Sequence, residues 1–150
     1  MDSLVASLVD TNILVYCYDF AAPHKREAAR DLLLKGSAKR DLLIPHQAMV
    51  EFVNVTTRKR GDGNPLLPPE EAWRQAEDLL NAFPVLYPNE WVFRTAILGM
   101  AAYRLAWDDA HLWAYAEHYG IPEILSEGFQ HGRWYGTVRV RNPFVEMGLA

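Results

Sequence analysis

Short apolar segments alternate along this chain with longer segments that begin at a proline or at a capping residue. Short apolar runs bounded by turn residues are typical of buried strands, and the longer segments have helical spacing. Strands that alternate with helices predict a parallel sheet with helices on both faces. We therefore expect an α/β fold built around a mostly parallel central sheet.

The same signals place the individual elements. Strands are expected at 4–9, 41–44, 83–86, 123–125 and 138–141. Helices are expected from Pro23 to about residue 35 with Gly36 as terminator, at 45–59 and at 69–81. Two more are expected, from a cap at Asn89 to about residue 105 and from a cap at Asp108 to Gly120. The linker-like stretch 61–65 is too short to separate domains, so 1–150 is expected to form one domain.

Composition narrows the classes of protein. The chain has 150 residues, half of them hydrophobic, which suits one compact core. Cys17 is the one cysteine, so no internal disulfide is expected and a reducing cytoplasm is the natural compartment. No stretch resembles a signal peptide or is long enough to span a membrane. The net charge of −4 argues against coating nucleic acid by charge alone, but it is compatible with holding a phosphate through a metal.

Polar side chains follow two of the expected strands. Asp10 comes directly after the first strand, and Ser126 and Glu127 come directly after the strand at 123–125. Ligands of open parallel sheets bind beyond the carboxyl ends of the strands, so these residues are expected on the functional rim. The alternative for Asp10 is a helix cap for a helix that starts near Asn12.

Glu51 lies in the middle of an expected helix. Gln47, Asn54 and Arg58 share its face at helical spacing and form a polar stripe with it. The stripe can line a cleft, with Glu51 on a metal and Arg58 near a phosphate. An ordinary solvated helix face explains the same pattern, and this helix alone favours that simpler interpretation.

Asp109 has apolar neighbours on its own helix face. Leu112, Trp113 and Ala116 lie three, four and seven residues further on. A carboxylate on the inward face of a helix costs several kcal/mol unless it is paired or bound to a metal. Its place in the first turn favours the anion. Clustered oxygen ligands suit Mg²⁺ or Mn²⁺ rather than zinc, and the five histidines do not form a zinc site.

Five segments together resemble the PIN-domain ribonucleases, and among them the VapC toxins of bacterial toxin–antitoxin pairs. Residues 9–16 are similar to the opening motif of that family. Glu51 follows Ile44-Pro45 where the second acid is expected, and Asp109 begins what looks like the third-acid helix. The segments 124–132 and 142–144 resemble the fourth motif and the closing signature. The five occur in the expected order over nearly the whole chain.

The resemblance implies an α/β/α sandwich of three layers and a Mg²⁺- or Mn²⁺-dependent endoribonuclease whose metal activates water against an RNA phosphodiester. It implies Asp10, Glu51 and Asp109 as catalytic residues and metal ligands. The supporting residues would be Thr11, Asn12 and Ser126, and the candidates for binding phosphate or RNA are Arg58 and Arg133. A cognate antitoxin would inhibit the chain, which would also form a homodimer.

This sequence departs from the family at Gly128, where the family usually has Asp. A PIN module that binds RNA or antitoxin without efficient cleavage is therefore the alternative to an active ribonuclease. A small Mg²⁺-dependent phosphatase is less favoured, because Asn12 stands where that class has a second Asp. The apolar residues of the helix after Asn89 exceed one core stripe, which fits either a dimer or antitoxin surface or burial within the monomer.

Overall fold

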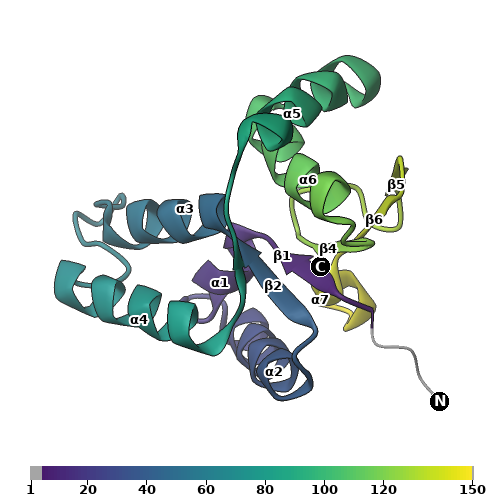
Figure 1. Cartoon of the computed structure of the whole chain (residues 1–150). Coiled ribbons are helices and arrows are strands. Elements are labelled where there is room, and N and C mark those ends of the chain that lie inside the picture. The colour runs from purple at the N-terminus through teal and green to yellow at the C-terminus, as the bar shows by residue number, and fades with distance from the viewer. Residues whose placement is uncertain (1–4, 150) are drawn as a thin grey trace.

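The computed structural model of the chain describes residues 5–149. Its strands are β1 (Ser7–Val9), β2 (Leu42–Pro45), β3 (Val85–Leu86), β4 (Glu123–Leu125), β5 (Trp134–Tyr135) and β6 (Val138–Arg141). Its helices are α1 (Thr11–Tyr16), α2 (Pro23–Lys39), α3 (His46–Thr57), α4 (Pro69–Ala82), α5 (Glu90–Tyr103), α6 (Trp107–Tyr119) and α7 (Pro143–Glu146). Figure 1 shows these elements in place.

The six strands form one sheet in the order β3-β2-β1-β4-β6-β5. All neighbouring pairs are parallel except β5 and β6, which form an antiparallel edge. The register between β1 and β4 pairs Val9 with Leu125, so these two strands end side by side. The mostly parallel sheet predicted from the alternation of segments is confirmed.

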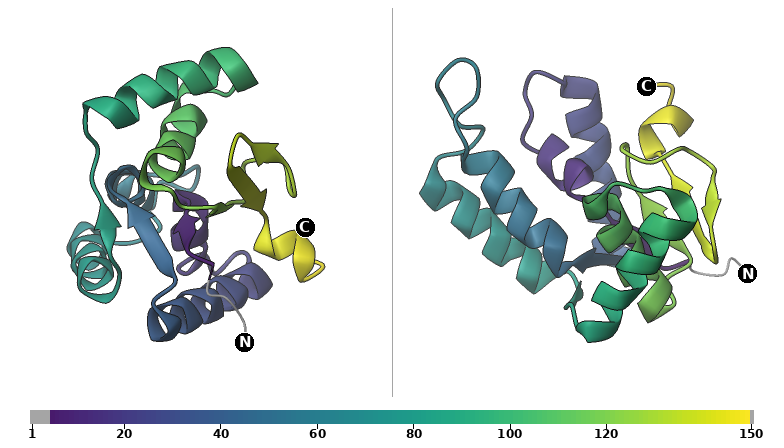
Figure 2. Two further views of the ribbon diagram at one scale, coloured as in Figure 1. Left: turned by 45° about the vertical axis from the view of Figure 1, so that its right-hand side comes forward. Right: turned by 90° about the horizontal axis from the view of Figure 1, so that it is seen from above.

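Helices cover both faces of the sheet. Leu8 and Val9 are adjacent in β1 and both fully buried, yet their side chains belong to different cores. Leu8 packs with residues of α5 and α6, whereas Val9 packs with residues of α1, α2, α3 and α4. Figures 1 and 2 show α5 and α6 on one side of the strands and the N-terminal helices on the other, which makes three layers.

The helix that begins at Pro23 does not end at Gly36, contrary to the sequence prediction. It continues to Lys39, and Arg40 takes the left-handed conformation that ends it. Gly36 is instead a point of close packing, because a Cβ there would lie 2.0 Å from Cδ1 of Leu42 on β2. A glycine therefore marks a close approach of α2 to the sheet rather than a terminus.

Asp108 is not the cap of its helix, which is a second correction. The helix begins at Trp107 with Ala106 in the cap position, so Asp108 and Asp109 both lie in the first turn. The cap at Asn89 is confirmed, because its side chain accepts a hydrogen bond from the backbone N–H of Val92 at 3.0 Å. Residue 4, where the first strand was expected to begin, lies outside the described residues.

Three short elements were not among the predicted strands and helices: α1, β5 and α7. Each is between two and six residues long, which is too short for a periodic pattern to distinguish it from a loop. A helix just after Asp10 appeared only as the alternative explanation of that residue. Within the described residues, no helix combines the length and the apolar character needed to cross a membrane.

Candidate functional site

Asp10 and Ser126 meet at the carboxyl edge of the sheet, where β1 and β4 end. The backbone N–H of Asp10 donates to the carbonyl of Leu125 at 3.0 Å, which continues the ladder past the strand ends. The Ser126 hydroxyl then donates to Oδ2 of Asp10 at 2.6 Å. The parallel register brings together two residues that are 116 positions apart, as predicted for the rim of a parallel sheet.

The carboxylate of Asp10 has two structural roles. Its Oδ1 accepts from the backbone N–H of Thr11 at 2.6 Å, so it also caps α1. Its Oδ2 faces Ser126, and the amide nitrogen of Asn12 lies 3.4 Å from the same oxygen. The two explanations considered for this residue, a helix cap and a rim carboxylate, are thus both correct.

Burial is the main reason why the pKa of Asp10 is raised from 3.8 to about 6. The hydrogen bonds from Ser126 and Thr11 act in the opposite direction and lower this pKa. The negative charges of Glu51 and Asp109 raise it further. The ionised form of Asp10 is therefore disfavoured in the site as it stands, and a cation beside the carboxylate would stabilise it.

Glu51 faces Asp10 from the neighbouring helix. Its Oε2 accepts from the Thr11 hydroxyl at 2.7 Å, and its Oε1 accepts from the Gln47 amide at 3.2 Å. The same Gln47 amide donates to the backbone carbonyl of Asp108 at 3.0 Å and so joins α3 to the start of α6. Glu51 therefore lines a cleft and Gln47 bridges to α6, whereas Asn54 and Arg58, the rest of the polar stripe, are exposed.

Asp109 completes the acidic group from the third element, α6. Burial raises its pKa, and the charges of Asp108 and Glu51 raise it further. Leu112, Trp113 and Ala116, which share the face of Asp109, are buried in the core, as their spacing predicted. In residues 5–149, no three Asp, Glu, His or Cys side chains are arranged closely enough to hold one metal ion directly among them.

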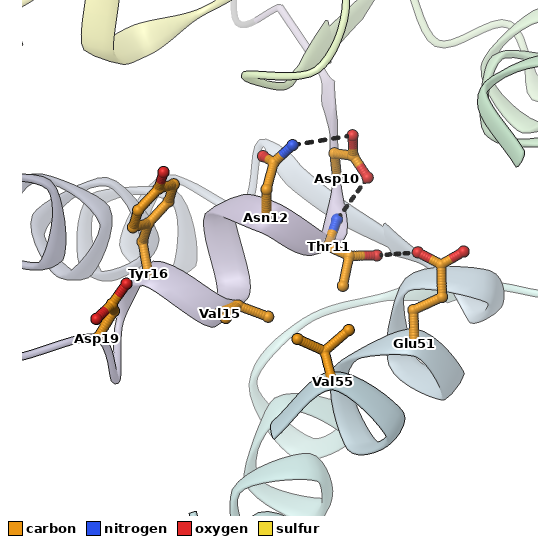
Figure 3. A pocket seen from close by; sticks show the side chains of 8 residues that line it. All are labelled: Asp10, Thr11, Asn12, Val15, Tyr16, Asp19, Glu51 and Val55. Atoms are coloured by element: carbon orange, nitrogen blue, oxygen red, sulfur yellow. Dashed lines mark hydrogen bonds between the residues drawn. The ribbon is translucent and has the colours of Figure 1, made fainter. Parts of the chain in front are cut away.

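A pocket of about 420 Å³ opens beside these carboxylates, between α1 and α3. Figure 3 shows Asp10 and Glu51 at one end of it and Asp19 at the other. Val15 and Val55 form an apolar wall between the two ends. The pocket combines clustered anionic oxygens with an apolar surface next to them.

The loop after β4 carries Gly128, where a fourth acid was expected. A Cβ at this position would lie 3.6 Å from Oγ of Ser126 and 3.7 Å from Nδ2 of Asn12, which are ordinary contacts. The φ angle of Gly128 is not positive, so a side chain is compatible with this backbone. A residue with a side chain at 128 would therefore face the acidic group.

The side chain of Glu127 points away from Asp10, toward Tyr16 and Lys25. Its two carboxylate oxygens accept from the Tyr16 hydroxyl at 2.6 Å and from the Lys25 ammonium at 2.5 Å. Tyr16 and Lys25 were not among the predicted site residues. No local pattern links Lys25 to Glu127, because 102 residues separate them.

The two predicted phosphate-binding arginines lie apart from the hydrogen-bonded group around Asp10. Arg58 is exposed and stands just after the last residue of α3. The guanidinium of Arg133 lies over the ring of Tyr135, 4.6 Å from its centroid. No hydrogen bond in the described part of the chain joins either arginine to the acidic residues, so their role stays a prediction.

Comparison with known protein families identifies the family of this chain. The model of the PIN domain matches residues 7–133, a range that contains Asp10, Glu51, Asp109 and Ser126. This chain belongs to the PIN-domain family. A sequence search of curated proteins finds no match.

Solved structures similar to this PIN domain are VapC toxins, alone or in VapBC complexes. The DNA-bound VapBC of Salmonella typhimurium has a chain 13% identical, with a TM-score of 0.69 over 93% of this chain and 98% of that one. A toxin–antitoxin complex from Klebsiella pneumoniae has a chain 16% identical, with a TM-score of 0.67 over 92% of this chain and 98% of that one. VapC20 of Mycobacterium tuberculosis is a toxin that cleaves the sarcin–ricin loop. It is 14% identical, with a TM-score of 0.59 over 79% of this chain and 87% of that one. At these identities the likeness concerns the fold.

Proposed function

We propose that this PIN domain is a Mg²⁺- or Mn²⁺-dependent endoribonuclease toxin of the VapC kind. The observation that carries the proposal is the pair Asp10 and Glu51, joined through Thr11 at the carboxyl edge of the sheet, with the charge of Asp109 acting on Asp10 from α6. Asp10 and Glu51 line the pocket, and Asp109 lies near enough for its charge to raise the pKa of Asp10. The likeness of the fold to VapC toxins supports the same reading.

The donor set fits a hard divalent cation in its chemistry. Carboxylate oxygens are the ligands that Mg²⁺ and Mn²⁺ prefer, and Mg²⁺ is usually held by one or two carboxylates while it keeps several waters. Asp10 and Glu51, joined through Thr11, would hold the ion, and Asp109 would complete the site through a bound water. When bound, the ion would lower the pKa of its water and neutralise charge on the phosphate.

The polar neighbours of the acids would orient them. Thr11 fixes the carboxylate of Glu51, and its backbone N–H fixes one oxygen of Asp10. Ser126 fixes the other oxygen of Asp10, and Asn12 lies within reach of both Ser126 and Asp10 at 3.4 Å. Donors held in place in this way reduce the reorganisation that binding an ion and an RNA phosphate requires.

The decisive experiment compares Mn²⁺-dependent cleavage of RNA by the purified chain and by Asp10→Asn. Cleavage by the native chain and its loss by at least about a hundredfold in the variant are expected, because a ligand has been removed. Asp108→Asn is the matched control, since it removes the same charge from the exposed neighbour of Asp109. Equal cleavage by Asp10→Asn and the native chain would reject the proposal.

The alternative function is a PIN module that binds RNA or antitoxin without efficient cleavage, and Gly128 is the observation that favours it. The open space at Gly128 allows a direct test, because Gly128→Asp places a carboxyl beside Ser126 and Asn12 without backbone strain. Strong cleavage that appears only in Gly128→Asp would identify a nuclease fold disabled at one position. Cleavage by the native chain would show that three acids suffice.

For partners we propose a cognate antitoxin and a second copy of the chain. One face of α5 packs on α6 through Val92, Ala96 and Gly99, whereas the opposite face exposes large apolar residues. The exposed residues are Trp91, Phe93, Ile97, Leu98 and Met100. This excludes full burial of α5 within the monomer. A helix with apolar residues on both faces is typical of an interface.

Light scattering during size-exclusion chromatography measures the dimer. Leu98→Glu on α5 should convert a dimer into a monomer, because a charge placed in an apolar interface is left without a partner. Leu34→Glu on α2 is the control, since Leu34 is 73% exposed and Leu98 is 67% exposed. A monomer in the native chain, or an equal effect of the two variants, would contradict a dimer through α5.

A further inference from the structure

Glu127 is held by two side chains at the flank of the acidic pocket. The Tyr16 hydroxyl donates to Oε1 and the Lys25 ammonium to Oε2, so both carboxylate oxygens are occupied. Lys25 also lies 5.2 Å from the ring centroid of Tyr16 and 5.4 Å from that of Phe144. The side chains of Lys25 and Glu127 are only 23% and 29% exposed, so this pair is better shielded than the pairs Lys35–Asp31 and Arg94–Glu90.

The backbone of Glu127 is much closer to Asp10 than the direction of its side chain suggests. Its N–H donates to Oδ1 of Asn12 at 3.3 Å, and Nδ2 of the same Asn12 lies 3.4 Å from Oδ2 of Asp10. Tyr16, which holds the carboxylate, itself lines the pocket together with Asp10 (Figure 3). One asparagine side chain therefore separates the Glu127 backbone from the central carboxylate.

The neighbouring position leaves space on the pocket side of the loop. Gly128 has no side chain, and a Cβ there would meet only Ser126 and Asn12, at 3.6 and 3.7 Å. A glutamate side chain is long enough to cross from the next residue into such a space. In the structure this side chain is instead paired with Lys25 and Tyr16.

We propose that Glu127 is a latent fourth carboxylate of the acidic pocket, which Lys25 and Tyr16 hold in reserve. In this arrangement Lys25 is a positioning residue, and loss of its ammonium frees the carboxylate to turn toward Asp10 and a bound divalent cation. The inference rests on the metal site proposed above. It concerns the direction of one side chain and requires no movement of the sheet.

Mn²⁺ titration by calorimetry tests the inference with four forms of the full chain: native, Lys25→Met, Glu127→Gln and the double variant. Lys25→Met keeps an unbranched side chain, one atom shorter, and removes its charge. We expect it to tighten Mn²⁺ binding by roughly tenfold, because one more anionic oxygen ligand becomes available. Glu127→Gln in the same background should abolish this gain.

Removal of a nearby positive charge would also tighten binding without any new ligand, so a second measurement is needed. Water-proton relaxation counts the water molecules on bound Mn²⁺. A carboxylate that enters the coordination shell displaces at least one water, whereas a change of charge at a distance leaves the count unaltered. Tyr16→Phe, which removes one hydrogen bond and no charge, should shift affinity and water count in the same direction by a smaller amount.

The outcomes separate the two proposals. If Asp10→Asn binds Mn²⁺ as tightly as the native chain, the metal site itself is wrong. If Asp10→Asn loses Mn²⁺ but Lys25→Met and Tyr16→Phe bind it no more tightly than the native chain, the site stands and the latent carboxylate is wrong. A gain that persists with Gln at 127, or that leaves the water count unchanged, also overturns the inference.

Discussion

Ser126 Oγ lies 2.6 Å from Oδ2 of Asp10 and also accepts the backbone N–H of Gly128 at 2.9 Å. One hydroxyl thus connects the carboxylate at the end of β1 to the loop that follows β4. Ser126 is fully buried, so its hydroxyl makes both bonds without contact with bulk solvent. This relationship makes the position of the loop and the charge of Asp10 depend on each other.

Ser126→Ala is expected to lower the free energy of unfolding at neutral pH by roughly 1.5–3 kcal/mol, the range for a hydrogen bond to a charged group. It should also raise the pKa of Asp10, because the bond from Ser126 lowers that pKa in the native chain. Urea unfolding at neutral pH and at pH 4 measures both effects, since the cost should shrink where Asp10 is protonated. Ser37→Ala on the partly exposed face of α2 is the control and should change little. An equal loss at both pH values would contradict this role.

The raised pKa of Asp10 predicts a pH dependence of stability. Between pH 4 and pH 6 the folded chain keeps a proton that the unfolded chain has lost, so the free energy of unfolding falls as the pH rises through this window. The rise of the pKa from 3.8 to about 6 corresponds to a destabilisation of the folded state by roughly 3 kcal/mol. This destabilisation is fully present only above that window. Asp10→Asn should be more stable than the native chain by up to this amount at pH 7.5, with no difference near pH 3.

Thermal unfolding of the two proteins across this pH range gives the measurement. Asp108→Asn serves as its control, because Asp108 is exposed and its removal should change stability by less than about 1 kcal/mol. A parallel pH dependence of the native chain and Asp10→Asn would contradict the assignment of the effect to Asp10.

Thr11→Val tests the link between α1 and Glu51. Valine keeps the shape of a side chain that is 7% exposed but removes the hydroxyl that donates to Oε2 of Glu51 at 2.7 Å. The expected cost is about 1–3 kcal/mol in urea unfolding, together with weaker Mn²⁺ binding in calorimetry, because Glu51 is no longer held toward Asp10. Thr11→Ser keeps the hydroxyl and should retain most of the affinity. If valine and serine behave alike, the hydroxyl does not position Glu51.

Gly36→Ala tests why a glycine stands inside α2. Helix propensity alone predicts a gain of about 1 kcal/mol from this change. The contact with Leu42 predicts the opposite, because the new Cβ would lie 2.0 Å from Cδ1 and 2.3 Å from Cγ of that side chain. We expect a net loss of about 1–3 kcal/mol in urea unfolding. Gly61→Ala, which meets nothing within 4 Å, is the control, and a more stable Gly36→Ala would show that Leu42 moves aside freely.

Much of the fold could be predicted because its signals are local. Pro23 at the first position of α2, Asn89 at the cap of α5 and Gly120 after α6 each act within one turn of their helix, and the structure confirms all three. The signals failed where one residue type serves two purposes. Gly36 looks like a helix terminator, but it is retained for contact with Leu42, a residue of β2 that no local pattern connects to it.

The sequence by itself determined the alternation of strands and helices and the placement of Asp10 and Ser126 at strand ends, because strand polarity and helix caps depend on neighbouring residues. Only the tertiary structure decided the 2.6 Å contact between these two residues, which helices cover each face of the sheet and the direction of Glu127. The physical reason lies in the distance along the chain. The partner that turns Glu127 away from the pocket, Lys25, is 102 residues away, and the packing of α2 against the sheet brings it there.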